Sequence, residues 1–179
     1  MVRVAVTVSR QIVELNWNTV VLYPAGYYNS RVRVRPALTL PDGWQFASAL
    51  DGAQTQGSTT QFAETTLETL VDSPLFAGRY FRRVDLDPGG RAPVHLDIVA
   101  DRADQLQASE AQVRLHGNLV QQAYRLFGPP HYDHYDFLFA LSDRVGGLGV
   151  EHHRSNESGV GGGYFTDWDS AASDRDLLP

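Results

Sequence analysis

Apolar and polar residues alternate with a period of two through much of the first hundred residues. At the start, Val2, Val4, Val6 and Val8 alternate with polar or small residues. This pattern places one face of a strand in a core. We predict further strands at residues 19–23, 31–40, 59–65, 78–86 and 93–100. Pro36 interrupts the second of these, which indicates an edge position or a bulge.

Turn residues separate these short segments. Pro41-Asp42-Gly43 has the composition of a tight turn, and Asp87-Pro88-Gly89-Gly90 joins the last two strands as a hairpin. Residues 67–72 are compatible with one helical turn. Many short strands with frequent turns favour an antiparallel β-sandwich, to which we assign residues 1–101.

The periodicity becomes helical after residue 102. Apolar residues recur at helical spacing and form one stripe, which consists of Leu115, Leu119, Val120, Ala123, Leu126 and Phe127. Ser109 and Gln112 have the spacing of a capping box, and Gly128-Pro129-Pro130 is a helix stop. Strands are predicted at Tyr135–Leu141 and at 150–154, and a glycine-rich loop at 158–163. The predicted fold class is mainly β with α (α+β), and residues 102–179 form the second unit.

Composition removes several classes of function. The chain has 15 basic and 21 acidic residues and a net charge of -6, which argues against a nucleic-acid surface. Arg31, Arg33 and Arg35 alternate, and we interpret them as a solvated strand face. Cysteine is absent, so thiolate zinc sites and thiol catalysis are excluded. No apolar run approaches the roughly 18 residues of a membrane span. The sequence leaves localisation and oligomeric state open.

Histidines and glycines are concentrated between residues 131 and 163. A zinc site could be imagined from the pairs His131/His134 and His152/His153. However, adjacent strand residues point to opposite faces, and no His-Glu-x-x-His helix is present. We therefore expect no complete zinc site in this chain. The glycine stretches lack the Lys-Ser/Thr of a phosphate-binding loop, and Ser155 lacks a nucleophile elbow.

Glu151 is the main candidate for a binding residue. It follows Gly147 and Gly149, which would allow another backbone to approach the strand closely. A carboxylate in this position could bind the cationic amine of a peptide through a charge-assisted hydrogen bond. The simpler alternative is an exposed glutamate on an edge strand. Ser155-Asn156-Glu157 is equally compatible with a polar turn.

The span DHYDFLFALSDRVGGLGVEHHRSNE resembles the glycyl aminopeptidase family, zinc metallopeptidases of the gluzincin group. Other segments resemble the same family in the same order, namely Asn16-Trp17-Asn18, Leu22-Tyr23-Pro24-Ala25-Gly26, Leu40-Pro41-Asp42-Gly43-Trp44, Leu70-Val71-Asp72-Ser73-Pro74, Leu126-Phe127-Gly128, Tyr164-Phe165-Thr166-Asp167-Trp168-Asp169 and Arg175-Asp176-Leu177-Leu178-Pro179. The likeness covers nearly the whole chain.

The resemblance implies a β-sandwich that leads into a thermolysin-like catalytic domain, often followed by a PDZ domain. The zinc-binding His-Glu-x-x-His helix is expected directly after residues 176–179, so the chain would be an N-terminal fragment that ends before its metal ligands. Gly149-Val150-Glu151-His152 is similar to the family's Gly-Leu-Glu-His element, with Val in place of the commoner Leu. By this similarity Glu151 would bind the substrate's amino terminus. Gly147, Gly149, Val150, His152 and His153 would complete the substrate-binding set.

Two functions follow as expectations. In the first, the parent protein is a zinc aminopeptidase that hydrolyses peptides at free amino termini and releases small residues such as Gly or Ala. This chain alone would then bind no zinc, contain no catalytic residue and be inactive. In the second, the chain is a non-catalytic sandwich module that binds peptides or proteins.

Overall fold

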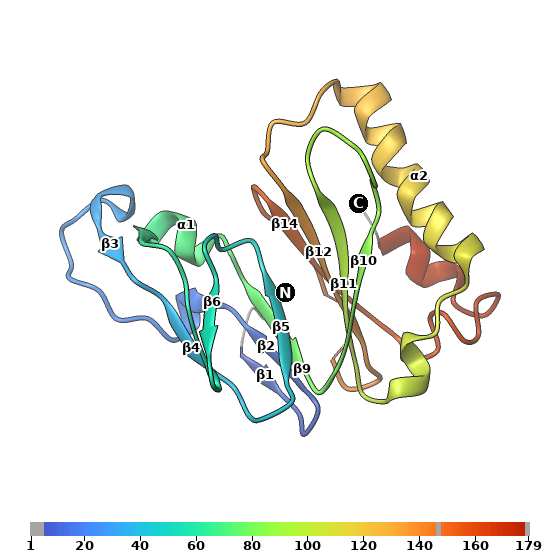
Figure 1. Ribbon diagram of the computed structural model, residues 1–179, viewed down its shortest axis with the longest axis horizontal. Coiled ribbons are helices and arrows are strands. Elements are labelled where there is room, and N and C mark those ends of the chain that lie inside the picture. The colour runs from blue at the N-terminus through green and yellow to red at the C-terminus, as the bar shows by residue number, and fades with distance from the viewer. Residues whose placement is uncertain (1–5, 146–147, 178–179) are drawn as a thin grey trace.

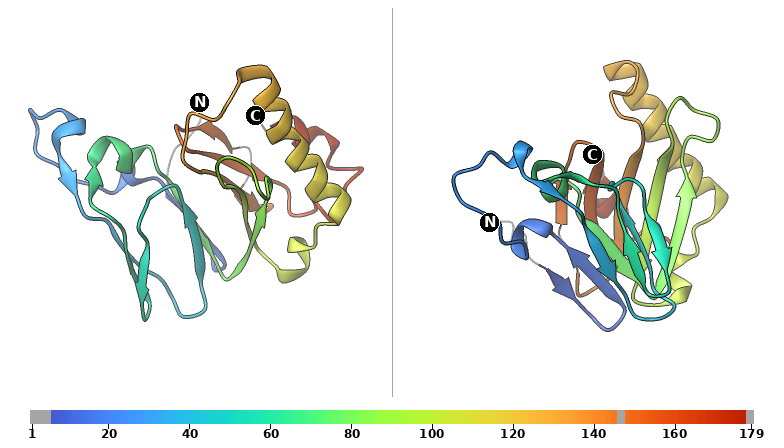
Figure 2. Two further views of the ribbon diagram at one scale, coloured as in Figure 1. Left: turned by 45° about the horizontal axis from the view of Figure 1, so that its top comes forward. Right: turned by 60° about the vertical axis from the view of Figure 1, so that its left-hand side comes forward.

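The molecule is built from stacked layers (Figure 1). The computed structural model describes residues 6–145 and 148–177. Two small antiparallel sheets pack on a four-stranded sheet, which packs on a five-stranded mixed sheet, and helix α2 (Glu110–Phe127) covers the far face. Figure 2 shows the same order of layers from two further directions. The predicted fold class, mainly β with α, is confirmed.

The two small sheets and the four-stranded sheet are antiparallel, and their strands come from residues before 79. The four-stranded sheet has the order β1 (Thr7–Val8), β2 (Ile12–Leu15), β9 (Leu75–Gly78) and β5 (Gln45–Ser48). The small sheets contain β3 (Arg33–Val34) with β8 (Thr65–Thr66), and β4 (Ala37–Thr39), β7 (Thr59–Gln61) and β6 (Gln54–Gln56). The short helical elements are α1 (Leu67–Val71), η1 (Trp17–Thr19) and η2 (Asn29–Arg31). The structure confirms the predicted tight turn at 41–43 and the helical turn within 67–72. It also confirms that the strand predicted at 31–40 is interrupted at Pro36.

Strand β9 is buried on both faces because it lies in the middle layer. Leu75 and Ala77 pack in a core with Trp17, whereas Phe76 packs in another core with Leu138 of the mixed sheet. This alternation follows from the period of two along a strand. It joins the N-terminal sheets to the mixed sheet through apolar contact.

The mixed sheet contains the remaining strands. Its order is β10 (Tyr80–Asp85), β11 (Val94–Ala100), β12 (Tyr135–Leu141), β14 (Ser155–Val160) and β13 (Leu148–Glu151). The β11–β12 and β12–β14 pairs are parallel and the outer pairs are antiparallel. The connection from β11 to β12 passes through η3 (Ala103–Leu106) and α2, as parallel neighbours require a crossover. The 3₁₀ helix η4 (Ala172–Leu177) follows β14.

Helix α2 has the predicted start and end. Ser109 and Gln112 form the capping box, and Gly128 follows the helix with a φ of 91°. The buried face, however, contains Gln112, His116 and Val120. Of the predicted stripe, Leu115, Leu126 and Phe127 are 54%, 75% and 82% exposed. The apolar spacing predicted the helix correctly but did not predict which face is buried. Gln112 and His116 can be buried although they are polar, because both form hydrogen bonds in the interior.

Three local predictions are wrong. The strand predicted at 150–154 ends at Glu151, and residues 152–154 form the loop that follows it. Residues 19–23 form no strand, and Leu22 is fully exposed, so this apolar run has no core to enter. Residues 158–160 are not a loop but belong to β14, whose six residues are all buried. The three polar residues 155–157 form the first half of this strand and not a turn. Tertiary pairing on both sides of β14 outweighs the low strand propensity of Ser, Asn and Gly.

The change from one sheet to the next occurs at Arg79, between β9 and β10. The sequence analysis assigned residues 78–86 and 93–100 to the sandwich unit of residues 1–101. In the structure β10 pairs with β11, and β11 pairs with β12, so both strands belong to the mixed sheet. Alternating apolar residues mark a strand without saying which sheet it joins. We therefore propose a domain division at residue 79 in place of the one at residue 102.

The contact between the two central sheets gives a stability prediction. Leu138 is fully buried between them, so Leu138→Ala should lower the free energy of unfolding by about 2–5 kcal/mol. The matched variant Leu126→Ala, on the exposed side of α2, should change it by less than about 0.5 kcal/mol. Urea titrations followed by circular dichroism measure both values. Equal losses in the two variants would contradict this packing.

Candidate functional site

Strand β13 forms one edge of the mixed sheet. Within the described residues it pairs with β14 alone, so the outer backbone groups of β13 have no strand partner. The register places Gly149 opposite Ser158 and Glu151 opposite Asn156. Gly147 lies outside the described residues. The strand thus brings together Gly149, Val150 and Glu151 at an open edge.

Glu151 is exposed and forms no ion pair within the described part of the chain. Because directly paired residues share a face, Glu151 lies on the same face as Asn156, and Asn156 lies beside Phe137 in β12. Phe137 belongs to the core under α2. Glu151 therefore faces the α2 side of the sheet, whereas Val150 and Glu157 face the N-terminal sheets.

The loop that follows β13 is bound by the N-terminal part of the molecule. Asp72, directly after α1, accepts a hydrogen bond from the backbone N–H of His153 at 3.1 Å and contacts Nδ1 of His152 at 3.2 Å. Arg154 donates to the carbonyl oxygen of Ala49 at 2.8 Å and pairs with Asp51 at 3.0 Å. The end of the candidate strand is thus positioned by residues more than 75 positions earlier in the chain.

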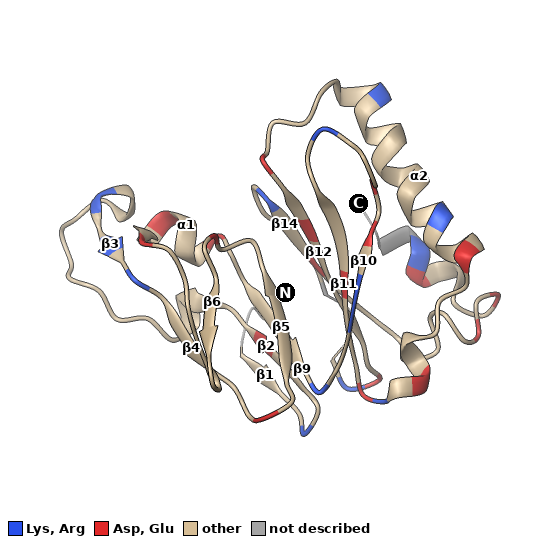
Figure 3. Ribbon diagram, viewed as in Figure 1, with Lys and Arg blue, Asp and Glu red and all other residues tan. Residues whose placement is uncertain are grey.

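His152 lies between two carboxylates. Its Nε2 is 3.0 Å from Oε1 of Glu157, a fully buried side chain, and Oε2 of Glu157 accepts a hydrogen bond from Asn16 at 3.0 Å. Burial alone lowers the pKa of His152, but the hydrogen bonds to Glu157 and Asp72 outweigh it and raise the pKa above its usual value. Figure 3 shows the acidic residues within the central strands of the mixed sheet. His152 and Asn16 thus give each oxygen of the buried Glu157 side chain a hydrogen-bond partner.

Glu14 of β2 adds a second acidic side chain to this interface. It is 3% exposed, and its Oε1 has no hydrogen-bond partner within the described residues. Burial, together with the charge of Glu157, raises the pKa of Glu14 to about 8. Glu14 is therefore largely a neutral acid at pH 7, which avoids a second uncompensated charge beside Glu157.

His152 and His153 were predicted from the sequence as site residues, but the residues that bind them were not. Asp72, Asn16 and Glu157 were missed as partners, although Asn16 and Asp72 lie in segments that carry the family resemblance. Their place in those segments was the one signal in the sequence that could have pointed to them. His152 and His153 serve here as contacts to the N-terminal sheets, and their role in substrate binding stays a prediction.

The described residues do not fit a bound zinc ion. No group of three or more His, Cys, Asp or Glu side chains in residues 6–145 and 148–177 is arranged to hold a metal. The histidines instead pair with carboxylates, as His152 does with Asp72 and Glu157. In the described part of the chain, no helix is long and apolar enough to cross a membrane.

Glu14 gives a pH prediction. Its pKa is about 8 in the folded protein and near its ordinary 4.5 when unfolded, so between these values only the folded state keeps the proton. The stability that this proton contributes is complete below about pH 4.5 and is lost as the pH rises through 8. Glu14→Gln, which stays neutral, should match the wild type at low pH and exceed it at pH 8 by on the order of 4 kcal/mol.

Urea titrations at pH 5, 6.5 and 8 measure this difference. The control Glu110→Gln, at an exposed position in α2, should follow the wild-type curve at each pH. If Glu14→Gln also ran parallel to the wild type, Glu14 would be ionised in the folded protein.

Comparisons with known proteins agree with this architecture. Residues 2–79 match the Peptidase M61 N-terminal domain, and the match ends where the chain passes into the mixed sheet. Comparison with curated proteins finds no match. The structure is similar to an aminopeptidase N family protein from Idiomarina loihiensis, with a TM-score of 0.72 and 15% identity, over 90% of this chain and 27% of that one.

A second similar structure is an M1 zinc metallopeptidase from Deinococcus radiodurans, with a TM-score of 0.50, 14% identity and coverage of 88% of this chain and 38% of that one. At these identities the likeness concerns the fold. The chain spans between about a quarter and two fifths of the two solved structures. Residues 2–79 thus match the N-terminal domain of M61 peptidases, and nearly the whole chain shares its fold with part of an aminopeptidase N family protein.

Proposed function

We propose that this chain is the N-terminal part of a zinc-dependent aminopeptidase, and that β13 is the strand along which the peptide substrate lies. The observation that carries the proposal is an open sheet edge that ends in the exposed carboxylate of Glu151. The M61 match of residues 2–79 and the aminopeptidase fold support it.

In this proposal the substrate binds as an additional strand. The outer N–H and C=O groups of β13 pair with the peptide backbone, and Gly149 presents no side chain to obstruct it. The carboxylate of Glu151 binds the ammonium group of the substrate's first residue. Charge recognition of this kind selects free amino termini over blocked ones. Preference for small first residues such as Gly or Ala rests on the family resemblance alone.

The N-terminal sheets contribute by fixing the position of β13. Asp72 binds both His152 and His153, and Asn16 and His152 bind Glu157 below the strand. A strand end bound at this many points keeps Glu151 in one position. Placement of a binding group within a fraction of an ångström is what transition-state binding requires.

Zinc bound by the longer polypeptide would supply Lewis-acid chemistry, polarising the scissile carbonyl and activating a water. In this proposal the zinc ligands belong to another part of the parent polypeptide. Residues 1–179 alone are then inactive as a peptidase. The chain's own part in the reaction is to bind and orient the amino-terminal end of the peptide.

A non-catalytic binding module is the second candidate. It is favoured by the open outer edges of β5, β6 and β10, which lie away from β13. The two candidates differ in what the longer polypeptide does: an aminopeptidase hydrolyses peptides and loses activity with a zinc chelator, whereas a binding module does neither.

Glu151→Gln in the longer polypeptide tests the proposed role of this residue. Loss of the charge-assisted bond to the substrate amine should lower kcat/KM by about ten- to hundredfold, or about 1–3 kcal/mol. Steady-state hydrolysis of short peptides with a free amino terminus measures the change, and Glu110→Gln in α2 is the matched control. An unchanged kcat/KM in an active enzyme would remove Glu151 from the substrate site, and absence of zinc-dependent hydrolysis in the unmodified polypeptide would reject the aminopeptidase.

A further inference from the structure

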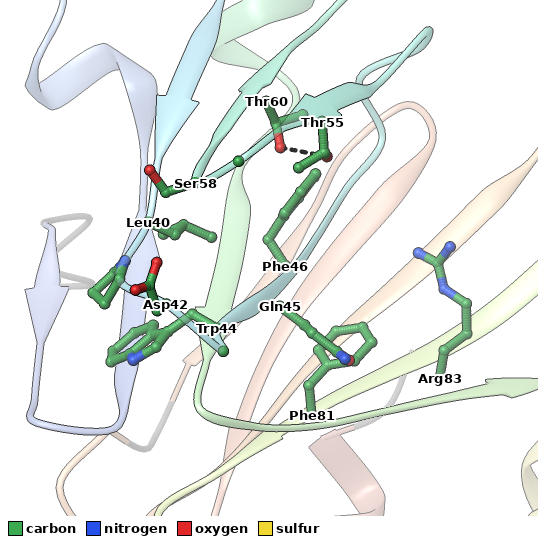
Figure 4. Close-up of a pocket in the computed structure, with 13 residues that line it drawn as sticks. Leu40, Asp42, Trp44, Gln45, Phe46, Thr55, Ser58, Thr60, Phe81 and Arg83 are labelled. Atoms are coloured by element: carbon green, nitrogen blue, oxygen red, sulfur yellow. Dashed lines mark hydrogen bonds between the residues drawn. The ribbon is translucent and has the colours of Figure 1, made fainter.

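A cavity of about 430 Å³ lies where the outer edges of three sheets meet. β5 ends the four-stranded sheet, β6 ends the three-stranded sheet and β10 ends the mixed sheet. Each strand contributes to the lining, through Phe46, Thr55 and Phe81 respectively (Figure 4). Within the described residues each strand pairs on one side only, so backbone N–H and C=O groups on the other side have no strand partner.

The lining combines aromatic rings with polar groups at its ends. Trp44, Phe46 and Phe81 are half-buried, and Phe46 is fixed by an edge-on contact with Phe62 at 5.6 Å between ring centroids. Arg83 lies at one end of the cavity and Asp42 at the other (Figure 4). A cavity of this size accommodates one or two large apolar side chains, and the rings supply the apolar contact surface.

The Arg83 side chain is held by Asp97, but one of its N–H groups is not used in that contact. Its Nε and Nη2 bind the carboxylate of Asp97 at 2.6 and 2.9 Å, and Asp97 is fully buried. Nη1 has no hydrogen-bond partner within the described residues, and the side chain is 45% exposed. A guanidinium that is already neutralised by carboxylates suits a neutral acceptor such as a peptide carbonyl. Asp42 forms no ion pair in the described part of the chain, so a basic side chain complements it.

Phe81 and Arg83 alternate along β10 and therefore share one face. Phe81 packs with the core between the two central sheets, so this face is directed toward the N-terminal sheets and the cavity. A peptide strand added beside β10 would place every second side chain on the same face. Its apolar side chain would enter the cavity, while its backbone paired with the edge of β10.

We propose that this cavity is a binding site for an extended peptide segment that adds to the edge of β10, with a large apolar side chain between Trp44, Phe46 and Phe81. A lysine or arginine near that side chain faces Asp42. The site is separate from the one at β13, because β10 and β13 lie at opposite edges of the mixed sheet. It therefore needs neither a free amino terminus nor catalysis. It is independent of the proposed aminopeptidase function, and it gives the second candidate, a binding module, a specific site and ligand.

Blocked pentapeptides test this site in the 179-residue chain. The probe is an N-acetylated, C-amidated peptide with Phe at its centre and Lys at one end, and the reference peptide has Ser in place of Phe. Isothermal titration should give at least tenfold weaker binding for the Ser peptide. Amide shifts in NMR spectra should be concentrated in β10. N-methylation of the amides on one edge of the Phe peptide should also weaken binding at least tenfold, because strand pairing uses those amides.

Variants locate the site. Trp44→Ala and Thr55→Arg, the latter an exposed position on β6, should each weaken binding of the Phe peptide at least tenfold. Asp42→Asn should weaken it severalfold, and less when the peptide's Lys is replaced. Glu151→Gln should leave binding unchanged, and thermal melting confirms that each variant is folded. Equal binding of the Phe and Ser peptides, no loss on N-methylation, or no loss in folded Thr55→Arg would each overturn the proposal.

Discussion

The burial of one carboxylate, that of Glu157, constrains much of this structure. The side chain lies in the middle of a sheet between two layers and is fully inaccessible to water. A buried carboxylate is tolerated only when it is paired and hydrogen-bonded, and here His152 and Asn16 meet that need. One partner comes from the loop after β13 and the other from the N-terminal sheets. The same electrostatic requirement therefore couples the sheet packing to the position of the candidate substrate strand.

Through this coupling the N-terminal sheets help to position the candidate strand, because they bind the loop that follows β13. Each residue of the loop after β13 has a partner in the N-terminal part of the chain. His152 and His153 bind Asp72, and Arg154 binds Ala49 and Asp51. Apolar packing of Ile12 and Phe76 against Leu138 brings the layers together. The polar contacts then fix the register between them. Neutral Glu14 fits this arrangement, since a second buried charge beside Glu157 would weaken it.

Much of the fold could be predicted from local patterns, and much of the site could not. The capping box at Ser109 and the strand Tyr135–Leu141 follow from short-range chemistry, and both are confirmed. Strand β14 is a different case, because Ser155, Asn156 and Glu157 have neither the propensity nor the hydrophobicity of a central strand. Their place depends on pairing with β12 and β13 and on the contact of Glu157 with Asn16, none of which local propensity reveals. The sheet membership of β10 and β11 was also beyond local reasoning, since alternation does not identify a neighbour.

The position of β14 between β12 and β13 has a consequence for biosynthesis. The bond from Asn16 to Glu157 joins residues 141 positions apart, so the inward face of β2 has no partner until most of the chain has left the ribosome. Until then Ile12 and Phe76 present an apolar surface to the cellular milieu. Contacts of such long range slow folding and prolong exposure to aggregation. Contact between the N-terminal sheets and the mixed sheet is therefore completed only late in synthesis, once Glu157 has been made.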